Sequence, residues 1–235
     1  MTSLFDISLI VHILAGSLSF IVAPVALIVR KGGNAHRFWG KIFFWAMIVV
    51  CITAWIMSSI KSNRFMFMVG VFSFYLVFSG YRSLFRKKLY QTGKVALIDW
   101  IVSIGTLLFG GWLLFIGIVA IPQGLAYVAL AFGVIAVLLS ISDIRNFIKP
   151  KADKNQWFFN HLTGMVAAYI AALSAFSVVN LDFEWMPVVV LWLWPSMAGI
   201  PLMIIWTRYY RRKFDKGRKI AELAEVKIQT EESLS

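Results

Sequence analysis

The chain has 235 residues and a formal net charge of +12, and 60% of its residues are hydrophobic while only 14% are charged. A water-soluble domain of this size has no interior large enough for so much apolar surface. The composition therefore excludes a soluble enzyme and a disordered protein, and it predicts an integral membrane protein. The single cysteine, Cys51, excludes an intrachain disulfide.

Long apolar segments follow one another along the whole chain. A bilayer core of about 30 Å is crossed by about 20 apolar residues in a helix. On that measure the sequence predicts an all-α bundle of seven transmembrane helices, over residues 4–29, 38–60, 65–85, 95–120, 125–142, 157–180 and 187–207. Residues 1–207 then form the transmembrane domain and residues 208–235 a basic tail, in which the stretch from Ile220 to Ser235 has the spacing of a short helix.

The basic residues mark one side of this predicted bundle. Every Lys and Arg except Lys61 and Arg64 lies in or beside the first, third or fifth connection, or in the C-terminal tail. Because cytoplasmic connections carry an excess of Lys and Arg, we predict that the N-terminus is outside and the C-terminus is in the cytoplasm. The same distribution favours anionic lipid headgroups as partners of the basic tail, and it argues against nucleic acid, since there is no folded basic domain to bind it.

Few ionisable side chains fall inside the predicted spans. Each is a candidate functional residue, because a polar group in lipid is costly. His36, Asp99, Asp143 and His161 come from four different helices and share the cytoplasmic level of the predicted bundle. His12 stands apart from them, in the outer half of the membrane or near its midplane.

Residues of these types suit more than one chemistry. All four members of the cytoplasmic group together suit a divalent metal ion such as zinc or iron. The two imidazoles His36 and His161, with His12 as a further candidate, suit the axial positions of one haem. The same groups also suit a proton-handling network, because histidine titrates near neutral pH. Alternatively, the two aspartates form ion pairs, with Arg82 for example, that fix helix registry.

Small residues line one face of the sixth predicted span. Gly164, Ala168, Ala172 and Ala175 recur at helical spacing, beginning one turn after His161. Such a stripe lets two helix backbones approach closely in a membrane. We therefore predict that it holds the His161 imidazole against a neighbouring helix.

Several familiar catalytic motifs are missing from the sequence. It contains no zinc-peptidase, nucleophile-elbow or phosphate-loop motif. The seventh predicted span has no lysine, which excludes a retinal Schiff base there, and three histidines allow one haem with two axial ligands but not two such haems. We predict a multi-pass membrane protein with a metal- or haem-binding polar cluster near its cytoplasmic side. The alternatives are a small-molecule or proton transporter and a non-catalytic membrane scaffold.

Four short motifs lie within residues 8–180. They are His12-Ile13-Leu14-Ala15-Gly16, the His-Arg-x-x-Gly motif at His36-Arg37-Phe38-Trp39-Gly40, Ser79-Gly80-Tyr81-Arg82, and His161-x-x-x-Met165. Together they resemble a family of predicted bacterial multi-pass membrane proteins of unknown function. The resemblance implies a seven-helix protein of a bacterial cytoplasmic (inner) membrane. It singles out His12, His36, Arg37, Asp99 and His161 without giving them roles.

Overall fold

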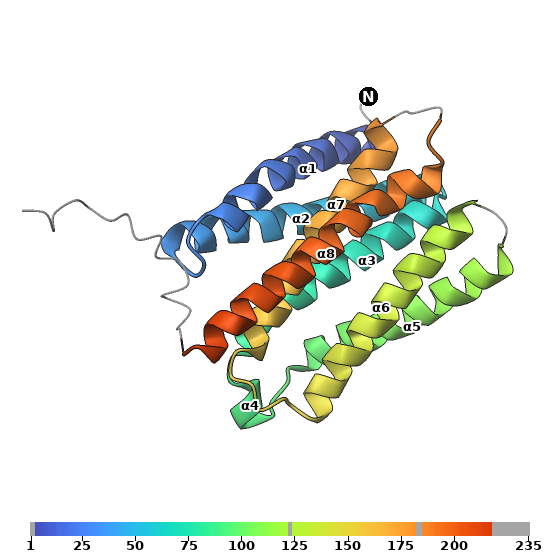
Figure 1. The fold of residues 1–235 in the computed structure, drawn as a ribbon. Coiled ribbons are helices and arrows are strands. Elements are labelled where there is room, and N and C mark those ends of the chain that lie inside the picture. Colours follow the sequence, from blue (N-terminus) through green and yellow to red (C-terminus); the bar gives the residue numbers. More distant parts are fainter. Residues whose placement is uncertain (1–2, 122–123, 182–184, 218–235) are drawn as a thin grey trace, which may run out of the picture.

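The computed structural model describes residues 3–121, 124–181 and 185–217. Every regular element within those ranges is helical, and seven of the helices are long and apolar enough to cross a membrane. The prediction of an all-α chain with seven spans is thereby confirmed (Figure 1).

The helices run through the chain with short connections between them. The long ones are α1 (Leu4–Ile28), α2 (Asn34–Ile60), α3 (Arg64–Arg82), α5 (Leu97–Val119), α6 (Gly124–Ile148), α7 (Gln156–Asn180) and α8 (Val188–Asp215). A 3-10 turn, η1 (Ser83–Phe85), continues α3 and is followed by the short α4 (Leu89–Thr92). Gly93 ends α4 with φ 61°, a left-handed conformation that favours glycine.

Helix α2 begins at Asn34, four residues before its predicted start, and two helices extend well beyond their predicted C-terminal ends. Helix α6 continues to Ile148 where the sequence predicted an end at residue 142, and α8 continues to Asp215 where it predicted residue 207. Apolar length predicts only the part of a helix that lies in the hydrocarbon core. A helix that meets no Pro or Gly there continues into the polar interface. The first part of the predicted basic tail is therefore helical. The helix predicted from Ile220 to Ser235 lies outside the described residues.

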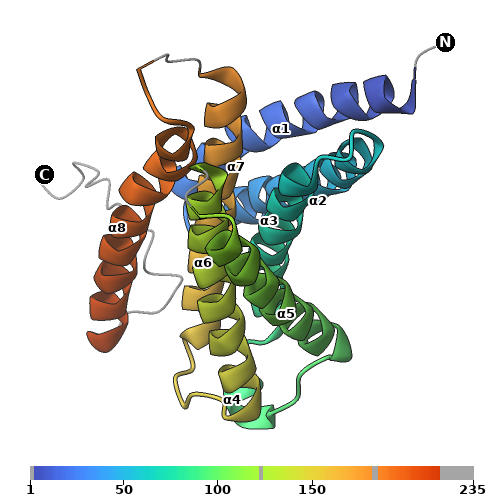
Figure 2. The same ribbon diagram turned by 90° about the vertical axis from the view of Figure 1, so that its right-hand side faces the viewer.

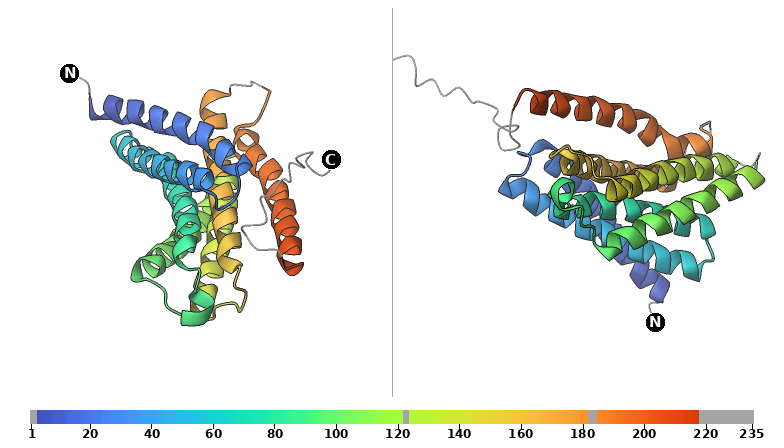
Figure 3. Two further views of the ribbon diagram at one scale, coloured as in Figure 1. Left: turned by 90° about the vertical axis from the view of Figure 1, so that its left-hand side faces the viewer. Right: turned by 90° about the horizontal axis from the view of Figure 1, so that it is seen from below.

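Helices α3 and α7 occupy the middle of the bundle. Helix α3 contacts α2 on one side and α7 on the other, and α7 also contacts α8. The α1–α2 pair and the α5–α6 pair lie on opposite sides of this centre (Figure 1). Helix α8 lies along one flank of the bundle beside α7 (Figures 2 and 3).

Large apolar side chains cover the outside of the long helices. Leu14 is 65% exposed, Leu108 71% and Ile205 63%, and each lies well inside a long helix. Exposing so much apolar surface to water would be very unfavourable, whereas exposing it to lipid is not. Helix length, hydropathy and this outward apolar surface together define an integral membrane protein that crosses the membrane several times.

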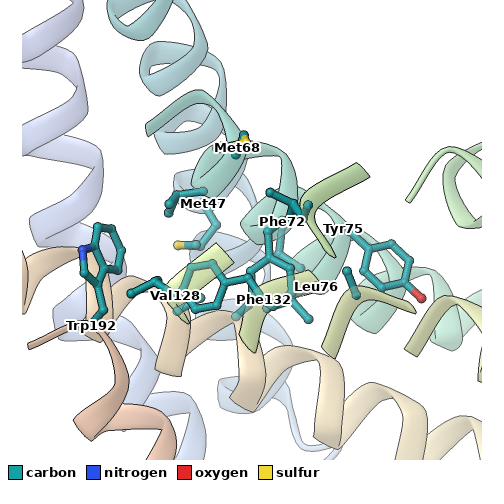
Figure 4. Close-up of a cluster of buried hydrophobic side chains, with 14 of the residues drawn as sticks. Met47, Met68, Phe72, Tyr75, Leu76, Val128, Phe132 and Trp192 are labelled. Carbon is teal, nitrogen blue, oxygen red and sulfur yellow. The ribbon is translucent and has the colours of Figure 1, made fainter. Parts of the chain in front are cut away.

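Aromatic rings fill much of the interior. Phe72 of α3 and Phe132 of α6 stack with their ring centroids 4.8 Å apart, and Trp192 of α8 meets Phe132 edge-on at 6.0 Å. Figure 4 shows Tyr75 at the opposite end of this cluster from Trp192, with Phe72 and Phe132 between them. The cluster joins α3, α6 and α8, and the Tyr75 hydroxyl lies at its far end from Trp192.

Two glycines let α3 and α7 touch backbone to backbone. A Cβ atom added to Gly164 would come within 2.5 Å of the Gly80 Cα atom, and one added to Gly80 would come within 2.9 Å of the Gly164 carbonyl carbon. No side chain fits between these helices at this level. The small-residue stripe thus does what the sequence predicted for it, with Gly80 as its partner on α3.

Replacing Gly164 by alanine should weaken the bundle. The added methyl group forces α3 and α7 apart, and overpacking of this kind costs about 1–3 kcal/mol of unfolding free energy. Gly111→Ala on α5 is the matched control, because a Cβ atom there meets nothing within 4 Å, and a helical alanine is slightly stabilising. Denaturant unfolding in mixed micelles measures both variants, and equal stability would contradict the backbone contact.

Candidate functional site

The fold brings His36 and His161 together. His36 lies in the first turn of α2 and His161 in the second turn of α7. Their ring centroids are 6.2 Å apart and their planes are nearly perpendicular, at 85°. Of the four residues predicted to share the cytoplasmic level, these two form the one pair whose side chains face each other.

Each of the two imidazoles is oriented by a backbone carbonyl. His36 Nδ1 lies 2.9 Å from the Ala26 carbonyl oxygen, and His161 Nδ1 lies 3.0 Å from the Gly80 carbonyl oxygen. Because a carbonyl only accepts hydrogen bonds, Nδ1 carries the proton and donates it in both rings. In the neutral form Nε2 then keeps its lone pair, which is the arrangement found for histidines that bind a metal through Nε2.

The position of His161 depends on the contact between α3 and α7. Gly164, whose backbone touches Gly80, lies one turn after His161 on α7. The Gly80 carbonyl that accepts from His161 belongs to the same glycine. The close approach therefore supplies both the space and the acceptor for this imidazole.

A lysine completes the His36 side of the site. Lys31 Nζ donates to the carbonyls of Leu27 and Ala26 at the end of α1, and it lies 5.0 Å from the Trp206 ring centre. A cation at this place satisfies carbonyls that the end of a helix leaves without partners. Lys31 is buried, and loss of water lowers the pKa of its ammonium group from 10.5 to about 8.

The surroundings of the histidine pair are positively charged. Lys31 acts electrostatically on both imidazoles, Arg37 acts on His36, and Lys87 acts on His161. Lys87 Nζ is held over the Trp157 ring, 4.7 Å from its centre. A ligand that carries negative charge is therefore favoured here over a bare cation.

Asp99 is engaged by an arginine. Arg82 Nε donates to Asp99 Oδ1 and Arg82 Nη2 donates to Asp99 Oδ2, both at 2.9 Å. The Asp99 side chain is only 1% exposed. Such a two-point pair is the strongest geometry available to these groups, and it links α3 to α5. The predicted ion-pair alternative is the one that the structure shows for this aspartate.

Asp143 is held by hydroxyl groups. Tyr75 Oη donates to Asp143 Oδ2 at 3.2 Å, and Ser79 Oγ donates to the same oxygen. Arg86 Nη2 donates to the Ser79 carbonyl at 3.1 Å, and its guanidinium lies 5.0 Å from the Phe147 ring centre. A carboxylate, two hydroxyls and a nearby guanidinium thus form a second polar group where α3 and α6 meet.

His12 lies away from both groups, as predicted. Its Nδ1 is 3.0 Å from Thr53 Oγ1 and 3.2 Å from the Val50 carbonyl oxygen, both on α2. Thr53 also donates to the carbonyls of Val49 and Val50. The contact fixes α1 against α2 and involves no acidic side chain.

The described part of the chain contains no group of three or more His, Cys, Asp or Glu side chains placed to hold a metal ion. What the fold assembles is a histidine pair, an Arg82–Asp99 pair and an Asp143–hydroxyl group, all toward the same end of the bundle. Comparison with known protein families, with curated proteins and with solved structures finds no match to this chain. The function is therefore inferred from these residues.

Three residues of these groups were not anticipated from the sequence. Lys31 sits in a connection where positive charge is expected in any case, and Tyr75 and Ser79 sit within an apolar run. Tyr75 and Ser79 are four residues apart, so they lie on one helix face and can share a partner. The sequence alone does not identify that partner, because it does not show that Asp143 faces α3.

Breaking the Arg82–Asp99 pair should destabilise the protein strongly. Arg82→Met leaves a buried carboxylate without a counter-charge, which costs about 3–5 kcal/mol of unfolding free energy. The double variant Arg82→Met/Asp99→Leu should recover most of that loss, because an apolar pair replaces the ion pair. Denaturant unfolding of the three proteins tests this, and a single variant as stable as the unmodified protein would disprove the role of the pair.

The lowered pKa of Lys31 should appear in the pH dependence of stability. Between pH 8 and 10.5 the unfolded chain still binds the proton that the folded protein has lost, so the unfolding free energy rises with pH in this window. Below pH 8 both states are protonated and the contribution is constant. Lys31→Met should lose this rise and the exposed Lys94→Met should keep it; parallel curves for all three proteins would show that Lys31 has an ordinary pKa.

Proposed function

We propose that the protein is a membrane haem protein in which His36 and His161 bind one iron from opposite sides. The observation that supports this is the pair of imidazoles whose Nδ1 atoms bond to backbone carbonyls, so that in the neutral ring Nε2 keeps the lone pair that could bind iron. At a metal–nitrogen distance of about 2 Å, two rings on opposite sides of one iron have centres about 6 Å apart. The observed separation of the ring centroids is 6.2 Å.

The number of donors favours haem over a free metal ion. A structural zinc ion takes about four protein ligands, and a catalytic zinc about three. Haem iron needs only two axial ligands, because the porphyrin supplies the other four nitrogens. Asp99 and Asp143, the further ligands of the four-residue metal site suggested by the sequence, have Arg82, Tyr75 and Ser79 as partners instead.

The positive charge around the histidine pair also favours haem over a bare metal ion. Lys31 and Lys87 act electrostatically on His161, and Lys31 and Arg37 act on His36. Haem carries two anionic propionate groups, which these ammonium groups suit, whereas a bare dication is repelled by them. When bound, haem would supply an iron that changes its oxidation state, and electron transfer is the function that such a site supports best.

The chain's own part is to hold the two rings. The carbonyls of Ala26 and Gly80 fix which nitrogen carries the proton and how each ring is turned, and an imidazole hydrogen-bonded in this way is a stronger ligand. The Gly80–Gly164 contact fixes the position of His161 relative to α3. These contacts would hold both rings in place if an iron were bound between them.

The same proposal includes an orientation. We place the histidine pair toward the cytoplasm and the N-terminus outside, in the inner membrane of a bacterium, with the basic residues at the end of α8 against anionic headgroups. The charge distribution supports this, because Lys31, Arg86, Lys87 and Lys151 lie in connections at the end of the bundle that carries the histidines.

The protein purified in mild detergent should show the Soret band of haem. His36→Ala and His161→Ala should each lose the band, since each removes an axial ligand. His12→Ala is the matched control and should keep it, because His12 lies away from the pair and bonds to Thr53. A protein that takes up no haem on reconstitution, or that keeps its band in both ligand variants, would refute the proposal and leave transport or scaffolding as the better reading.

A further inference from the structure

A cleft separate from the histidine pair lies between α3, α6, α7 and α8. It offers about 180 Å³ of space for small molecules. Its polar lining includes Ser79, Asp143 and Thr163, and its apolar lining includes Phe132, Ile200 and Met203. Neither His36 nor His161 lines it, so the cleft is a different binding site from the proposed haem site.

Asp143 faces this cleft with an oxygen that has no partner. Its Oδ2 atom accepts from both Tyr75 and Ser79, while within the described chain no hydrogen bond reaches Oδ1. The residue is 8% exposed and is among the residues that line the cleft. A carboxylate oxygen open to a cavity inside a membrane is costly unless something binds to it.

Charge and aromatic rings define what the cleft suits. Asp143 is the only charged residue among the described residues that line it. Phe72 and Phe132, which stack on each other, and Tyr75 form part of its wall, as does the thioether of Met203. A carboxylate beside aromatic faces is a favourable environment for an organic cation, because both the charge and the ring quadrupoles attract it.

The cleft reaches the surface of the bundle near the end of the apolar segment of α6. Ser142 on α6 lines it and is itself exposed, and α6 meets α8 over only a short stretch. Because the predicted apolar segment of α6 ends at residue 142, this opening lies where the hydrocarbon meets the polar interface. An amphipathic molecule at that level can therefore reach the cleft between α6 and α8.

We propose that this cleft binds a lipophilic organic cation, a substituted ammonium group on a small apolar or aromatic body. The cationic group lies at Asp143 Oδ1 and the body lies against Phe132, Ile200 and Met203. The volume of the cleft is suitable for such a molecule, because a cavity of about 150 Å³ in another protein holds a benzene molecule. A neutral lipid chain would fill the apolar part but would leave the carboxylate oxygen without a partner.

The test compares two probes of the same shape and different charge. Benzyltrimethylammonium is a permanent cation, and neopentylbenzene is its neutral isostere. Equilibrium dialysis of the full-length protein in detergent micelles should show that the cation binds more tightly than the isostere by about tenfold or more. Asp143→Asn, which still accepts from Tyr75 and Ser79, should remove this preference.

A second pair of variants keeps the test valid if Asp143→Asn does not fold. Ile200→Trp fills the cleft and should abolish binding of the cation, while Ile204→Trp, one turn further on α8 and 43% exposed to lipid, should not. Equal affinity for the two probes, or cation binding that survives Asp143→Asn or Ile200→Trp, would overturn the proposal. The haem band is measured on the same samples, so loss of one site is distinguishable from loss of the other.

Discussion

The absence of water from the bilayer core is the constraint on which this structure depends. A polar group there must find its partner inside the protein. Helices satisfy most backbone groups, and what remains is concentrated at helix ends, whose last carbonyls have no N–H group to accept from. The carbonyl of Ala26 at the end of α1 accepts from Lys31 and His36. Where α3 tightens into a 3-10 turn, the carbonyls of Ser79 and Gly80 accept from the side chains of Ser83, Arg86 and His161, the Ser79 carbonyl in addition to the backbone N–H of Ser83. The candidate site is thus built at helix ends because acceptors are available there.

Close helix contact decides which side chains can reach these acceptors. Between α3 and α7 the two glycines leave only backbone at the interface, and this brings His161 within hydrogen-bond distance of Gly80. Between α3 and α6 the spacing is set by stacked Phe72 and Phe132, which leaves room beside Asp143 for a cleft. Gly80 on one face of α3 and an aromatic ring on another therefore give the same helix a close neighbour in α7 and a more distant one in α6.

The sequence predicted the number of spans, their order and the common level of His36, Asp99, Asp143 and His161, because apolar length and charge are local properties of the chain. It did not predict how these residues pair. The pairing depends on how each helix is rotated about its own axis. Segments such as the one around Tyr75 are apolar on every face, so their sequence does not indicate which face points inward. The sequence also placed the ends of α6 and α8 too early, because their last turns are polar and lie beyond the hydrocarbon.

Ser79 and Gly80 are neighbours in the chain, yet they serve different places. The Ser79 hydroxyl supports the Asp143 carboxylate on one side of α3, and the Gly80 carbonyl supports the His161 ring on the other. A small rotation of this turn about the α3 axis would change both contacts at once. Two adjacent residues thus tie the position of the Asp143 carboxylate to the position of the His161 imidazole, and a substitution that moves this turn would disturb the polar contacts on both sides of α3.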